Sequence, residues 1–363
     1  MRILFVLPGI DGGGIGQIVY NYISHINKEK FICDVLSLDT ASGSTPFLLS
    51  KMKEVANSVS LFSRHHKVKR FLRYIKILSA SHYDIVHVHF DENSFWYLVL
   101  AKSFGVKVLI AHSHINKGIE KSLHKKIIVS FLKRIVTAKF ACGIDAGRFL
   151  WGNASDVYVM ANAIEMKDFV RPMEDTYKLQ LKHKIGIAGN KLIVGTVGRI
   201  SEQKNPYFIV NIVEEISKIR KDVIFIWIGE GDMYEEIQNE ISKRKLSEHF
   251  ILLGRRNDVC MLLKIMDAFI LPSLYEGLPI VGVESQAAGV PFFFSCNITR
   301  EVGISAWAEY LDLNSPAKWA HEILKNAGSG IRVYDVEHSV YNIDVAVKFL
   351  EDKYEQLYVK GSR

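Results

Sequence analysis

The stretch Leu271–Pro291, LPSLYEGLPIVGVESQAAGVP, has the pattern that the rest of the chain follows. The apolar run that ends at Pro272 predicts a buried strand, and Pro279 predicts the start of a helix. Backbone N–H groups at such a helix start can bind a phosphate or a hydroxyl group. Glu276 and Glu284 lie eight residues apart across this turn, so their carboxylates are placed to hold hydroxyl groups of one ligand.

The same order of strand, loop and helix recurs along the chain. The run RILFVL at residues 2–7 predicts a buried strand, and the glycine-rich residues 9–16 lead into a helical pattern. Strand and helix patterns then alternate, and LIVGTVGRI, which begins at Leu192, restarts this order. Such alternation predicts parallel sheets with crossover helices, the doubly wound α/β class.

The chain length and the two starting points predict two domains. With 363 residues, of which 48% are hydrophobic, the chain has enough material for two cores. We place an N-terminal domain at 1–165 and a C-terminal domain at 166–342, with the polar residues 165–189 as the linker and leading edge of the second. A final helical segment, 343–363, is expected to pack back across both domains.

The composition is typical of a cytoplasmic protein. The most apolar region, residues 95–111, is interrupted by Lys102 and Lys107 and does not predict a membrane span. The apolar run at the start is too short for a signal peptide. The four cysteines have neither disulfide nor zinc spacing, which indicates a reduced compartment.

The net charge of +7 is concentrated in the N-terminal half. Residues 64–76 contain six Lys or Arg and no acid, and residues 117–139 contain seven with one Glu, so each contributes +6 and the remainder carries −5 (7 − 12). A local excess of this size predicts a basic surface on this half. Nucleic acid is not expected as the partner, because no nucleic-acid-binding motif accompanies the charge.

An amphipathic pattern at residues 119–136 lies within the second basic segment. Its apolar side chains form one stripe and its cations lie outside that stripe. Two interpretations fit: a docked helix with a solvated face, or a helix on an anionic membrane at the inner face of the cell. The candidate membrane-surface residues are Lys125, Lys126, Lys133 and Arg134.

The segment GIDGGGIG at residues 9–16 differs from the standard phosphate loops. It lacks the GK[ST] of a Walker A loop, and Gln17 stands where a dinucleotide fingerprint has its third glycine. Asp34 follows Gly14 by twenty residues but lies near the start of its strand, whereas a ribose-binding acid belongs at the end. A nicotinamide site is therefore not expected. A loop that a ligand approaches closely and a structural turn both stay open.

Two cations occur where the second half restarts. In VGRISEQKNP, Arg199 and Lys204 follow a strand and precede a helix that begins at Pro206. Ligands of parallel sheets bind at this edge, and a planar guanidinium beside a compact ammonium suits a pyrophosphate. Surface charge alone explains them less well, because cations are unfavourable at a helix start unless an anion binds there.

Two strand patterns carry His-x-His pairs, which are His87 with His89 and His112 with His114. Alternation places both members of a pair on one face, as a metal site requires. No cysteine or carboxylate cluster completes a ligand set beyond Asp91 and Glu92, so no metal is expected. We assign His112, at the end of its strand, to ligand contact and the first pair to packing.

Four motifs follow one another: GGGIG, AHSH, GRISEQKNP and EGLPIVGVE with its Glu-x7-Glu spacing. In this order they resemble a retaining glycosyltransferase of the GT-B fold, family 4, over nearly the whole chain. GGGIGQIVYNYISHI and LPSLYEGLPIVGVESQAAGVP most resemble the branch that builds bacterial capsular polysaccharides and exopolysaccharides. The resemblance implies two Rossmann-like domains facing a cleft, with the nucleotide-sugar bound mainly by the second and the acceptor by the first.

The resemblance also implies roles for single residues. Glu284 would bind the ribose, Glu276 would position hydroxyls of the transferred sugar, and His112 would lie beside that sugar, with His114 as the alternative. Arg255 would lie near the base. The implied catalytic residues are His112, Glu276, Arg199 and Lys204. The implied nucleotide-sugar-binding residues are Gly13, Gly14, Arg199, Lys204, Arg255, Glu276, Gly277, Leu278, Ile280 and Glu284.

The implied reaction moves a hexosyl or N-acetylhexosaminyl group, with retention, from a UDP-sugar to a lipid-linked saccharide. Arg199, Lys204 and helix N–H groups would stabilise the departing diphosphate, so neither a metal nor another cofactor is expected. Two alternatives stay open. One is an epimerase of the same fold, which would release nucleotide without an acceptor, and the other is a sugar- or nucleotide-binding protein without turnover.

Overall fold

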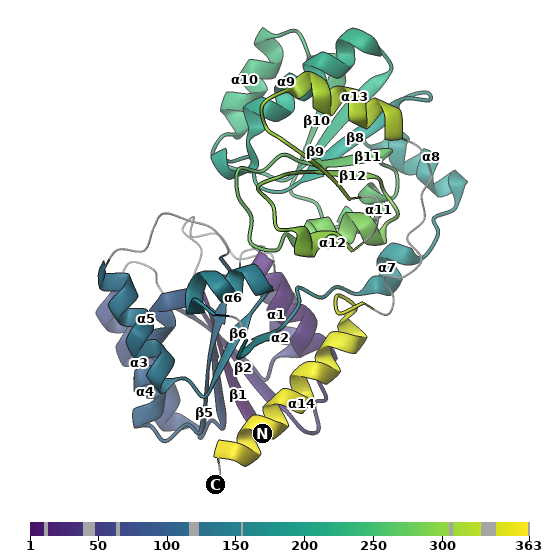
Figure 1. Ribbon diagram of the computed structural model, residues 1–363. Helices are drawn as coiled ribbons and strands as arrows, with labels where there is room; N and C mark the ends of the chain where they lie inside the picture. The colour runs from purple at the N-terminus through teal and green to yellow at the C-terminus, as the bar shows by residue number, and fades with distance from the viewer. Residues whose placement is uncertain are drawn as a thin grey trace. The chain divides into compact units, whose positions relative to one another are not determined.

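The computed structural model describes residues 1–10, 14–38, 48–62, 66–115, 123–153, 155–304, 308–327 and 339–361. The chain divides into two compact units: unit 1 comprises Met1–Ile164 and Val340–Arg363, and unit 2 comprises Glu165–Ser339. Each unit contains a parallel sheet with helices on both faces (Figure 1). The predicted class, two doubly wound α/β domains, is confirmed.

The sheet of unit 1 has the strand order β3-β2-β1-β4-β5-β6-β7, and its described pairings are all parallel. Its central strands are buried on both faces, which explains why their sequences are continuous apolar runs. The strands are β1 (Arg2–Leu7), β2 (Ile32–Leu38), β3 (Ser58–Phe62), β4 (Ile85–Val88), β5 (Val108–Ser113), β6 (Ala138–Ala141) and β7 (Val157–Val159).

Helices from several parts of the chain cover this sheet. One face packs against α3, α4, α5 and α6, where Leu4, Val6, Val86 and Val88 contribute to a buried apolar core. On the opposite face, His87 of β4 contacts Phe5 of β1 and Tyr354 of the C-terminal helix. The helices of unit 1 are α1 (Gly14–His25), α2 (Leu49–Val55), α3 (Lys67–Ala80), the 3-10 turn η1 (Asp91–Asn93), α4 (Ser94–Ser103), α5 (Leu123–Ile135), α6 (Ile144–Trp151) and α14 (Ile343–Gly361).

The sheet of unit 2 has the order β10-β9-β8-β11-β12-β13, again with parallel pairings. Apolar residues of α9, α10 and α13 pack on one of its faces. The strands are β8 (Leu192–Val197), β9 (Val223–Ile228), β10 (Phe250–Gly254), β11 (Ala268–Leu271), β12 (Phe292–Ser295) and β13 (Ala308–Leu311). The helices are α7 (Met166–Val170), α8 (Asp175–Lys184), η2 (Glu202–Lys204), α9 (Pro206–Ile219), α10 (Tyr234–Lys243), η3 (Ser247–His249), α11 (Val259–Leu263), α12 (Ile280–Ala287), η4 (Arg300–Val302) and α13 (Pro316–Asn326).

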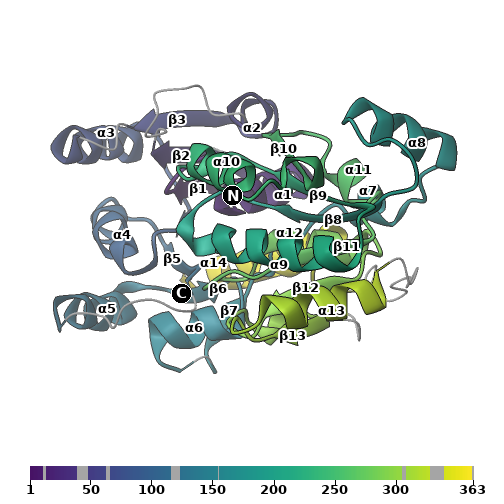
Figure 2. The ribbon, with the colours of Figure 1, turned by 90° about the horizontal axis from the view of Figure 1, so that it is seen from above.

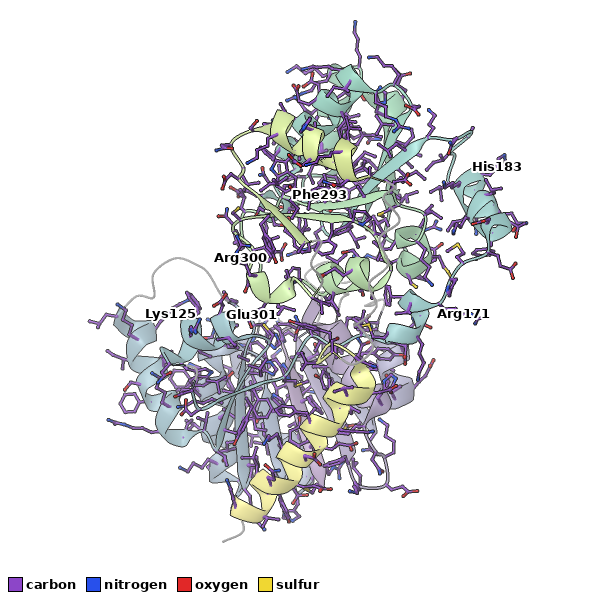
Figure 3. All side chains as sticks on the ribbon, turned by 45° about the vertical axis from the view of Figure 1, so that its right-hand side comes forward. Lys125, Arg171, His183, Phe293, Arg300 and Glu301 are labelled. Atoms are coloured by element: carbon purple, nitrogen blue, oxygen red, sulfur yellow. The ribbon has the colours of Figure 1, made fainter. Side chains whose placement is uncertain are left out.

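The segment predicted as a linker, residues 165–189, contains two helices, α7 and α8. Figure 3 labels Arg171 between them and His183 on α8. Lys264 Nζ donates to the carbonyl of Arg171 at 2.8 Å, which ties this segment to the region after α11. The helical pattern of α8 is weak because Leu181 is its only buried residue, while Tyr177 and Leu179 are exposed among polar side chains.

The C-terminal helix α14, yellow in Figure 1, belongs to unit 1 and packs beside α1. Its buried residues include Leu350 and Tyr354, both without solvent exposure. At its edge, Lys30 Nζ pairs with Glu355 Oε1 at 2.9 Å. These contacts make a segment from the end of the sequence part of the N-terminal unit.

Each sheet reverses its strand order once, between β1 and β4 in unit 1 and between β8 and β11 in unit 2. The two loops that leave such a pair of strands diverge and open a crevice at the carboxyl ends, where doubly wound proteins bind ligands. In unit 1 these loops follow Leu7 and Val88; in unit 2 they follow Val197 and Leu271. Within the described part of the chain, no helix is both long and apolar enough to cross a membrane.

Candidate functional site

The strongest polar contact at the switch point of unit 2 joins the loops after β8 and β11. Lys204 Nζ lies 2.6 Å from Glu276 Oε1, and the two side chains are only 14% and 9% exposed. Asn205 adopts a left-handed conformation (φ +56°) and lets α9 start at Pro206 directly after Lys204. The pair therefore lies at the carboxyl edge of the sheet, where sequence analysis predicted both residues.

Gln203 fixes the same two loops to each other and was not predicted from the sequence. Its Nε2 donates to Glu276 Oε2 at 3.2 Å and to the carbonyl of Tyr275 at 3.1 Å. Its own carbonyl accepts from the N–H of Leu274 at 2.9 Å. Both oxygens of Glu276 are thus hydrogen-bonded, which holds the carboxylate in one orientation.

Arg199 follows β8 and is solvent-exposed. No hydrogen bond or ion pair joins its guanidinium to another side chain in the described ranges, in contrast to Lys204. The turn around it needs glycine, because Gly198 has φ +149° and a Cβ atom there would lie 2.7 Å from Lys204 Cε. The backbone thus brings an unpaired guanidinium and a paired ammonium to one short loop.

Arg255 follows β10 and is exposed. Its Nε lies 4.0 Å from Glu230 Oε2, and both side chains are more than half exposed. Such a solvent-exposed ion pair contributes little to the stability of the fold. Arg255 thus lies directly after β10, and this contact does not hold it in a fixed position; its contact with the base stays a prediction.

The helix that follows Glu276 begins as predicted. Pro279 is the N-cap residue of α12, and Ile280 is its first residue. Leu278 is buried, whereas Gly277 and Ile280 are partly exposed. Gly277, Leu278 and Ile280 thus form the entry to α12, the place that a phosphate or hydroxyl would approach.

Glu284 lies one turn into α12 and is partly exposed at its surface. Burial of its carboxyl group raises the pKa from 4.5 to about 7. No described side chain hydrogen-bonds this carboxyl group, unlike that of Glu276. A carboxyl group without a protein partner is free to bind hydroxyl groups of a ligand.

In unit 1 the loop after β1 leads into α1, whose first residue is Gly14. Gly14 is exposed, and a Cβ atom there would meet nothing within 4 Å. Gly16 has a packing role, since a Cβ atom on it would lie 3.1 Å from the carbonyl oxygen of Gly9. Gly13 lies outside the described residues, so its predicted contact with the nucleotide-sugar stays a prediction.

Asp34 has structural partners that explain it without a ribose. Its carboxylate accepts from Arg2 Nε at 2.8 Å and from Asn57 Nδ2 at 2.8 Å, and Ser58 Oγ also donates to it. Burial opposes ionisation of Asp34, but these three hydrogen bonds outweigh it and lower the pKa. Asp34 therefore fastens β2 to its neighbouring segments.

The four histidines of the His-x-His pairs form one cluster in unit 1, which we name the imidazole stack: His87, His89, His112 and His114. The alternation predicted for each pair is confirmed, because all four rings lie on one face of β4 and β5. The rings of His112 and His114 stack with centroids 4.2 Å apart, and those of His87 and His89 with centroids 4.5 Å apart. The stack lies beside the switch point of unit 1.

Hydrogen bonds join the stack across the two strands. His87 Nε2 lies 3.1 Å from His112 Nδ1, and His89 Nδ1 lies 2.8 Å from His114 Nε2. Burial lowers the pKa of His87 to about 3 and that of His112 well below its ordinary value of 6.5. The rings are therefore neutral, and each of these bonds contains one hydrogen.

Three members of the stack, His87, His89 and His112, have ring nitrogens within 4.8 Å of one another, the arrangement from which a metal site is built. Both nitrogens of His87 are already hydrogen-bonded. The buried nitrogens without a partner are His89 Nε2 and His112 Nε2. A tetrahedral zinc site usually has three or four protein ligands, so metal binding would require breaking a bond of His87.

The two candidate ligand-contacting histidines differ in exposure. His112 is completely buried, whereas His114 is partly exposed and its backbone N–H donates to Asp91 Oδ1 at 2.9 Å. Burial raises the pKa of Asp91 to about 6. His114 thus lies at the outer edge of the stack and His112 behind it. Asp91 had been noted as a carboxylate beside the pairs, whereas Tyr354, which contacts His87, was not predicted as a member of this region.

The helices α3, α4 and α5 lie on one face of the sheet of unit 1 (Figures 1 and 2). The predicted single apolar stripe of residues 119–136 is wrong in one respect: Leu123, Ile127 and Phe131 are 74%, 49% and 49% exposed, while Val129 and Leu132 are buried. These three exposed residues recur every fourth position and so form a second apolar line on α5.

The neighbouring helices extend this exposed apolar surface. On α3, Val68 and Leu72 are exposed, and on α4 Trp96 and Val99 are exposed. The four candidate membrane-surface cations of α5, Lys125, Lys126, Lys133 and Arg134, are all exposed. Lys125, labelled in Figure 3, also pairs with Glu92 Oε1 at 2.7 Å. We name this exposed surface of α3, α4 and α5 the basic apolar face.

Comparisons with known proteins fit this geometry. Residues 178–299, which lie in unit 2, match the family model "Glycosyl transferases group 1". The chain is 29% identical over 350 residues to EpsF of Bacillus subtilis (strain 168), covering 91% of this chain and 88% of EpsF. It is 27% identical over 242 residues to the UDP-Gal:alpha-D-GlcNAc-diphosphoundecaprenol alpha-1,3-galactosyltransferase of Escherichia coli, covering 63% and 62% of the two chains.

A solved structure shows the same fold. The crystal structure of Anabaena Alr3699/HepE in complex with UDP superimposes with a TM-score of 0.79 at 16% identity, covering 98% of this chain and all of that one. The fold is therefore that of the GT-B glycosyltransferases. The relatives and the matched domain support the class glycosyltransferase for this chain.

Proposed function

We propose that this glycosyltransferase moves a hexosyl or N-acetylhexosaminyl group from a UDP-sugar to a lipid-linked saccharide, with retention, in capsular polysaccharide or exopolysaccharide synthesis. The observation that carries the proposal is the Lys204–Glu276 pair beside the exposed Arg199, at the switch point of unit 2 and directly before α12. The stretch Leu271–Pro291, which contains Glu276, resembles the corresponding stretch of enzymes that build capsular polysaccharides and exopolysaccharides. The structural relative with bound UDP supports the choice of nucleotide.

We assign the nucleotide-sugar donor to unit 2 because of the charged residues in the loops of this unit. A nucleoside diphosphate carries negative charge that Arg199 can bind as a fork and Lys204 as a point charge. The N–H groups at the start of α12 add the positive end of a helix dipole. Glu284, whose carboxyl group has no described hydrogen bond, is assigned to the ribose hydroxyls.

The reaction needs charge stabilisation more than a protein nucleophile. As the bond between the sugar C1 and the phosphate oxygen breaks, Arg199 and Lys204 stabilise the departing diphosphate. The acceptor oxygen forms its bond to C1 on the same face, and its proton passes to the departing phosphate oxygen. Glu276 is assigned to positioning, because both of its oxygens are already held by Lys204 and Gln203.

The exposed surface of unit 1 leads us to propose that the acceptor is bound to a membrane. Exposed apolar side chains beside exposed cations are typical of a protein surface that lies on an anionic membrane. On the basic apolar face, Leu123, Ile127 and Phe131 supply the apolar part. The named substrate of the Escherichia coli relative contains diphosphoundecaprenol, which supports a polyprenyl-linked acceptor and a peripheral position at the inner face of the cell membrane.

The proposal is tested by incubating the purified protein with a panel of UDP-sugars and a saccharide linked to undecaprenyl diphosphate. Mass spectrometry of the lipid and proton NMR of the new linkage identify the sugar and its anomeric configuration. We expect acceptor-dependent UDP release and an anomeric configuration equal to that of the donor. UDP release at the same rate without acceptor would support the epimerase instead. Tight UDP binding without turnover across the panel would support a binding protein.

A further inference from the structure

The imidazole stack is connected to the C-terminal helix by one hydrogen bond. The phenol oxygen of Tyr354 on α14 lies 2.7 Å from His87 Nδ1, and His87 Nε2 lies 3.1 Å from His112 Nδ1. Tyr354, His87 and His112 all have no solvent exposure. A continuous hydrogen-bonded chain thus runs from Tyr354 through His87 to the Nε2 atom of His112.

Only two arrangements of hydrogens fit this chain. In the first, Tyr354 donates to His87 Nδ1, His87 Nε2–H donates to His112 Nδ1, and His112 has its hydrogen on Nε2. In the second, every bond is reversed, and His112 Nε2 has a lone pair instead. The direction of the first bond therefore decides whether His112 offers a donor or an acceptor at Nε2.

The contacts of Tyr354 favour the first arrangement. A phenol O–H is a stronger acid than an imidazole N–H, and an imidazole nitrogen is a stronger base than a phenol oxygen, so O–H···N is the better bond. The separation of 2.7 Å is an ordinary distance for a hydroxyl donor. Burial also raises the pKa of Tyr354 well above its ordinary value, so the phenol keeps its hydrogen.

The other end of the chain supports the same direction. His112 Nε2 is buried and has no partner in the described structure. In the second arrangement the Tyr354 hydrogen would instead be buried without an acceptor, at a cost of about 1–3 kcal/mol. No ligand can relieve that cost at Tyr354, which is enclosed by residues such as Phe31 and His87. His112 is buried as well, but it lies at the carboxyl end of β5 behind the partly exposed His114, at the sheet edge where doubly wound proteins bind ligands.

We propose that Tyr354 is a positioning residue that acts through His87 and fixes His112 with its hydrogen on Nε2, where it donates to a substrate oxygen, either a sugar hydroxyl or a phosphate oxygen. This inference deepens the proposed function and rests on it for the identity of the oxygen. It also assigns a function to the contact between α14 and unit 1. A His112 held in this way donates a hydrogen bond and does not act as a general base.

The hydrogen positions can be measured directly by NMR of protein labelled with ¹⁵N at histidine, since the ¹⁵N shift separates an N–H nitrogen from one with a lone pair. We expect His112 to have its hydrogen on Nε2 in the wild type and a mixture of both tautomers in Tyr354→Phe. Tyr74→Phe is the matched control, because Tyr74 is also fully buried and its hydroxyl donates to a backbone carbonyl, that of Tyr97, at 3.2 Å. A wild-type hydrogen on Nδ1, or an unchanged tautomer in Tyr354→Phe, would overturn the proposal.

Steady-state kinetics with the donor and acceptor test whether the position of the hydrogen on His112 affects sugar transfer. We expect Tyr354→Phe to lower kcat about tenfold, which corresponds to the loss of one ordinary hydrogen bond, while Tyr74→Phe stays near the wild-type value. His87→Phe combined with Tyr354→Phe should be no slower than His87→Phe alone, because both act through one chain. Losses of kcat that add up in the double variant would contradict the proposal that Tyr354 acts through His87. A wild-type protein without any transferase activity would disprove the proposed function. The NMR result would still show which nitrogen of His112 carries the hydrogen.

Adding the lipid-linked saccharide, UDP or UDP-sugar separately tests whether the partner of His112 is a substrate oxygen or an ordered water. A shift of the His112 Nε2 resonance with the saccharide indicates an oxygen of the acceptor. A shift with UDP-sugar that is absent with UDP indicates a hydroxyl of the donor sugar, and a shift with UDP itself indicates a phosphate oxygen. A resonance that responds to none of them indicates water and would contradict the assignment of a substrate oxygen.

Discussion

Lys204 Nζ and Glu276 Oε1 lie 2.6 Å apart although 72 positions separate the two residues in the chain. They meet because β8 and β11 are neighbours in the sheet and their following loops leave from the same edge. Lys204 therefore has a structural role before any ligand binds, in addition to the diphosphate contact that we propose for it. Arg199, which has no such partner in the described structure, is free for the ligand alone.

Arg199 and Lys204 should therefore respond differently to truncation. Arg199→Ala should lower kcat/KM at least about 100-fold with little change in stability, because its exposed side chain stabilises only the departing diphosphate. Lys204→Ala should lower kcat/KM similarly and also lower the free energy of unfolding by about 3 kcal/mol, because Glu276 stays buried without its cation. Steady-state kinetics and urea unfolding measure both. Lys218→Ala, which truncates an exposed lysine on α9, is the control. Equal losses of stability in Arg199→Ala and Lys204→Ala would be inconsistent with the pairing of Lys204 and Glu276.

Glu284 should make unit 2 less stable as the pH rises. Its pKa is raised from 4.5 in the unfolded chain to about 7 in the folded one, so the folded state keeps a proton that the unfolded state releases. Stability is lost as the pH rises from 4.5 to about 7 and stays constant above. Glu284→Gln cannot ionise, so its stability relative to the wild type should increase across this window. Unfolding at pH 4.5, 6 and 8 checks this; a constant difference would mean that Glu284 titrates normally.

The imidazole stack should make unit 1 sensitive to acid. Burial lowers the pKa of His87 from 6.5 to about 3, so the unfolded chain binds a proton that the folded state excludes. Stability is complete above pH 6.5 and falls as the pH drops below it. His87 alone accounts for about 2 kcal/mol at pH 5. Urea unfolding at pH 5 and 7 should show a smaller acid-induced loss in His87→Phe than in the wild type, and identical losses would argue against a neutral buried His87.

Transfer should not depend on a divalent cation. The positive charges that a metal would supply are already present as Arg199, Lys204 and the start of α12. We expect full activity after dialysis against EDTA, measured by UDP release at saturating donor and acceptor. Activity that disappears with EDTA and returns with added Mg²⁺ or Mn²⁺ would mean that a metal supports the chemical step.

The basic apolar face should bind anionic vesicles. Replacement of Leu123, Ile127 and Phe131 by Ser should release the protein from vesicles that contain phosphatidylglycerol, because burial of these exposed side chains drives binding. Reversal of charge at Lys125, Lys126, Lys133 and Arg134 should weaken binding most at low salt. Flotation assays measure both, with Lys218→Glu in unit 2 as the control. A wild-type protein that stays at the bottom of the gradient would disprove membrane binding by this face.

The sequence by itself determined the fold class, and it predicted most of the residues that we assign to donor binding. Apolar runs bounded by glycine and proline predicted the parallel strands, because buried strands need apolar side chains on both faces. Arg199, Lys204, Glu276 and Glu284 were predicted from motifs that lie directly after strands or at a helix start. In a parallel sheet such positions share one edge, so local order along the chain also gives position in space.

Only the tertiary structure decided which side chains contact one another across the chain. The pairing of Lys204 with Glu276, the bonds from Gln203 and the chain from Tyr354 through His87 to His112 all depend on strand neighbours and helix packing. Residues 165–189 contain helices that their polar sequence did not predict. The spacing on α5 fitted both a docked helix and a membrane-surface helix, and the structure leaves Leu123, Ile127 and Phe131 exposed. The reason is physical: periodicity shows that a helix has an apolar side, whereas burial and hydrogen-bond partners depend on what packs against it.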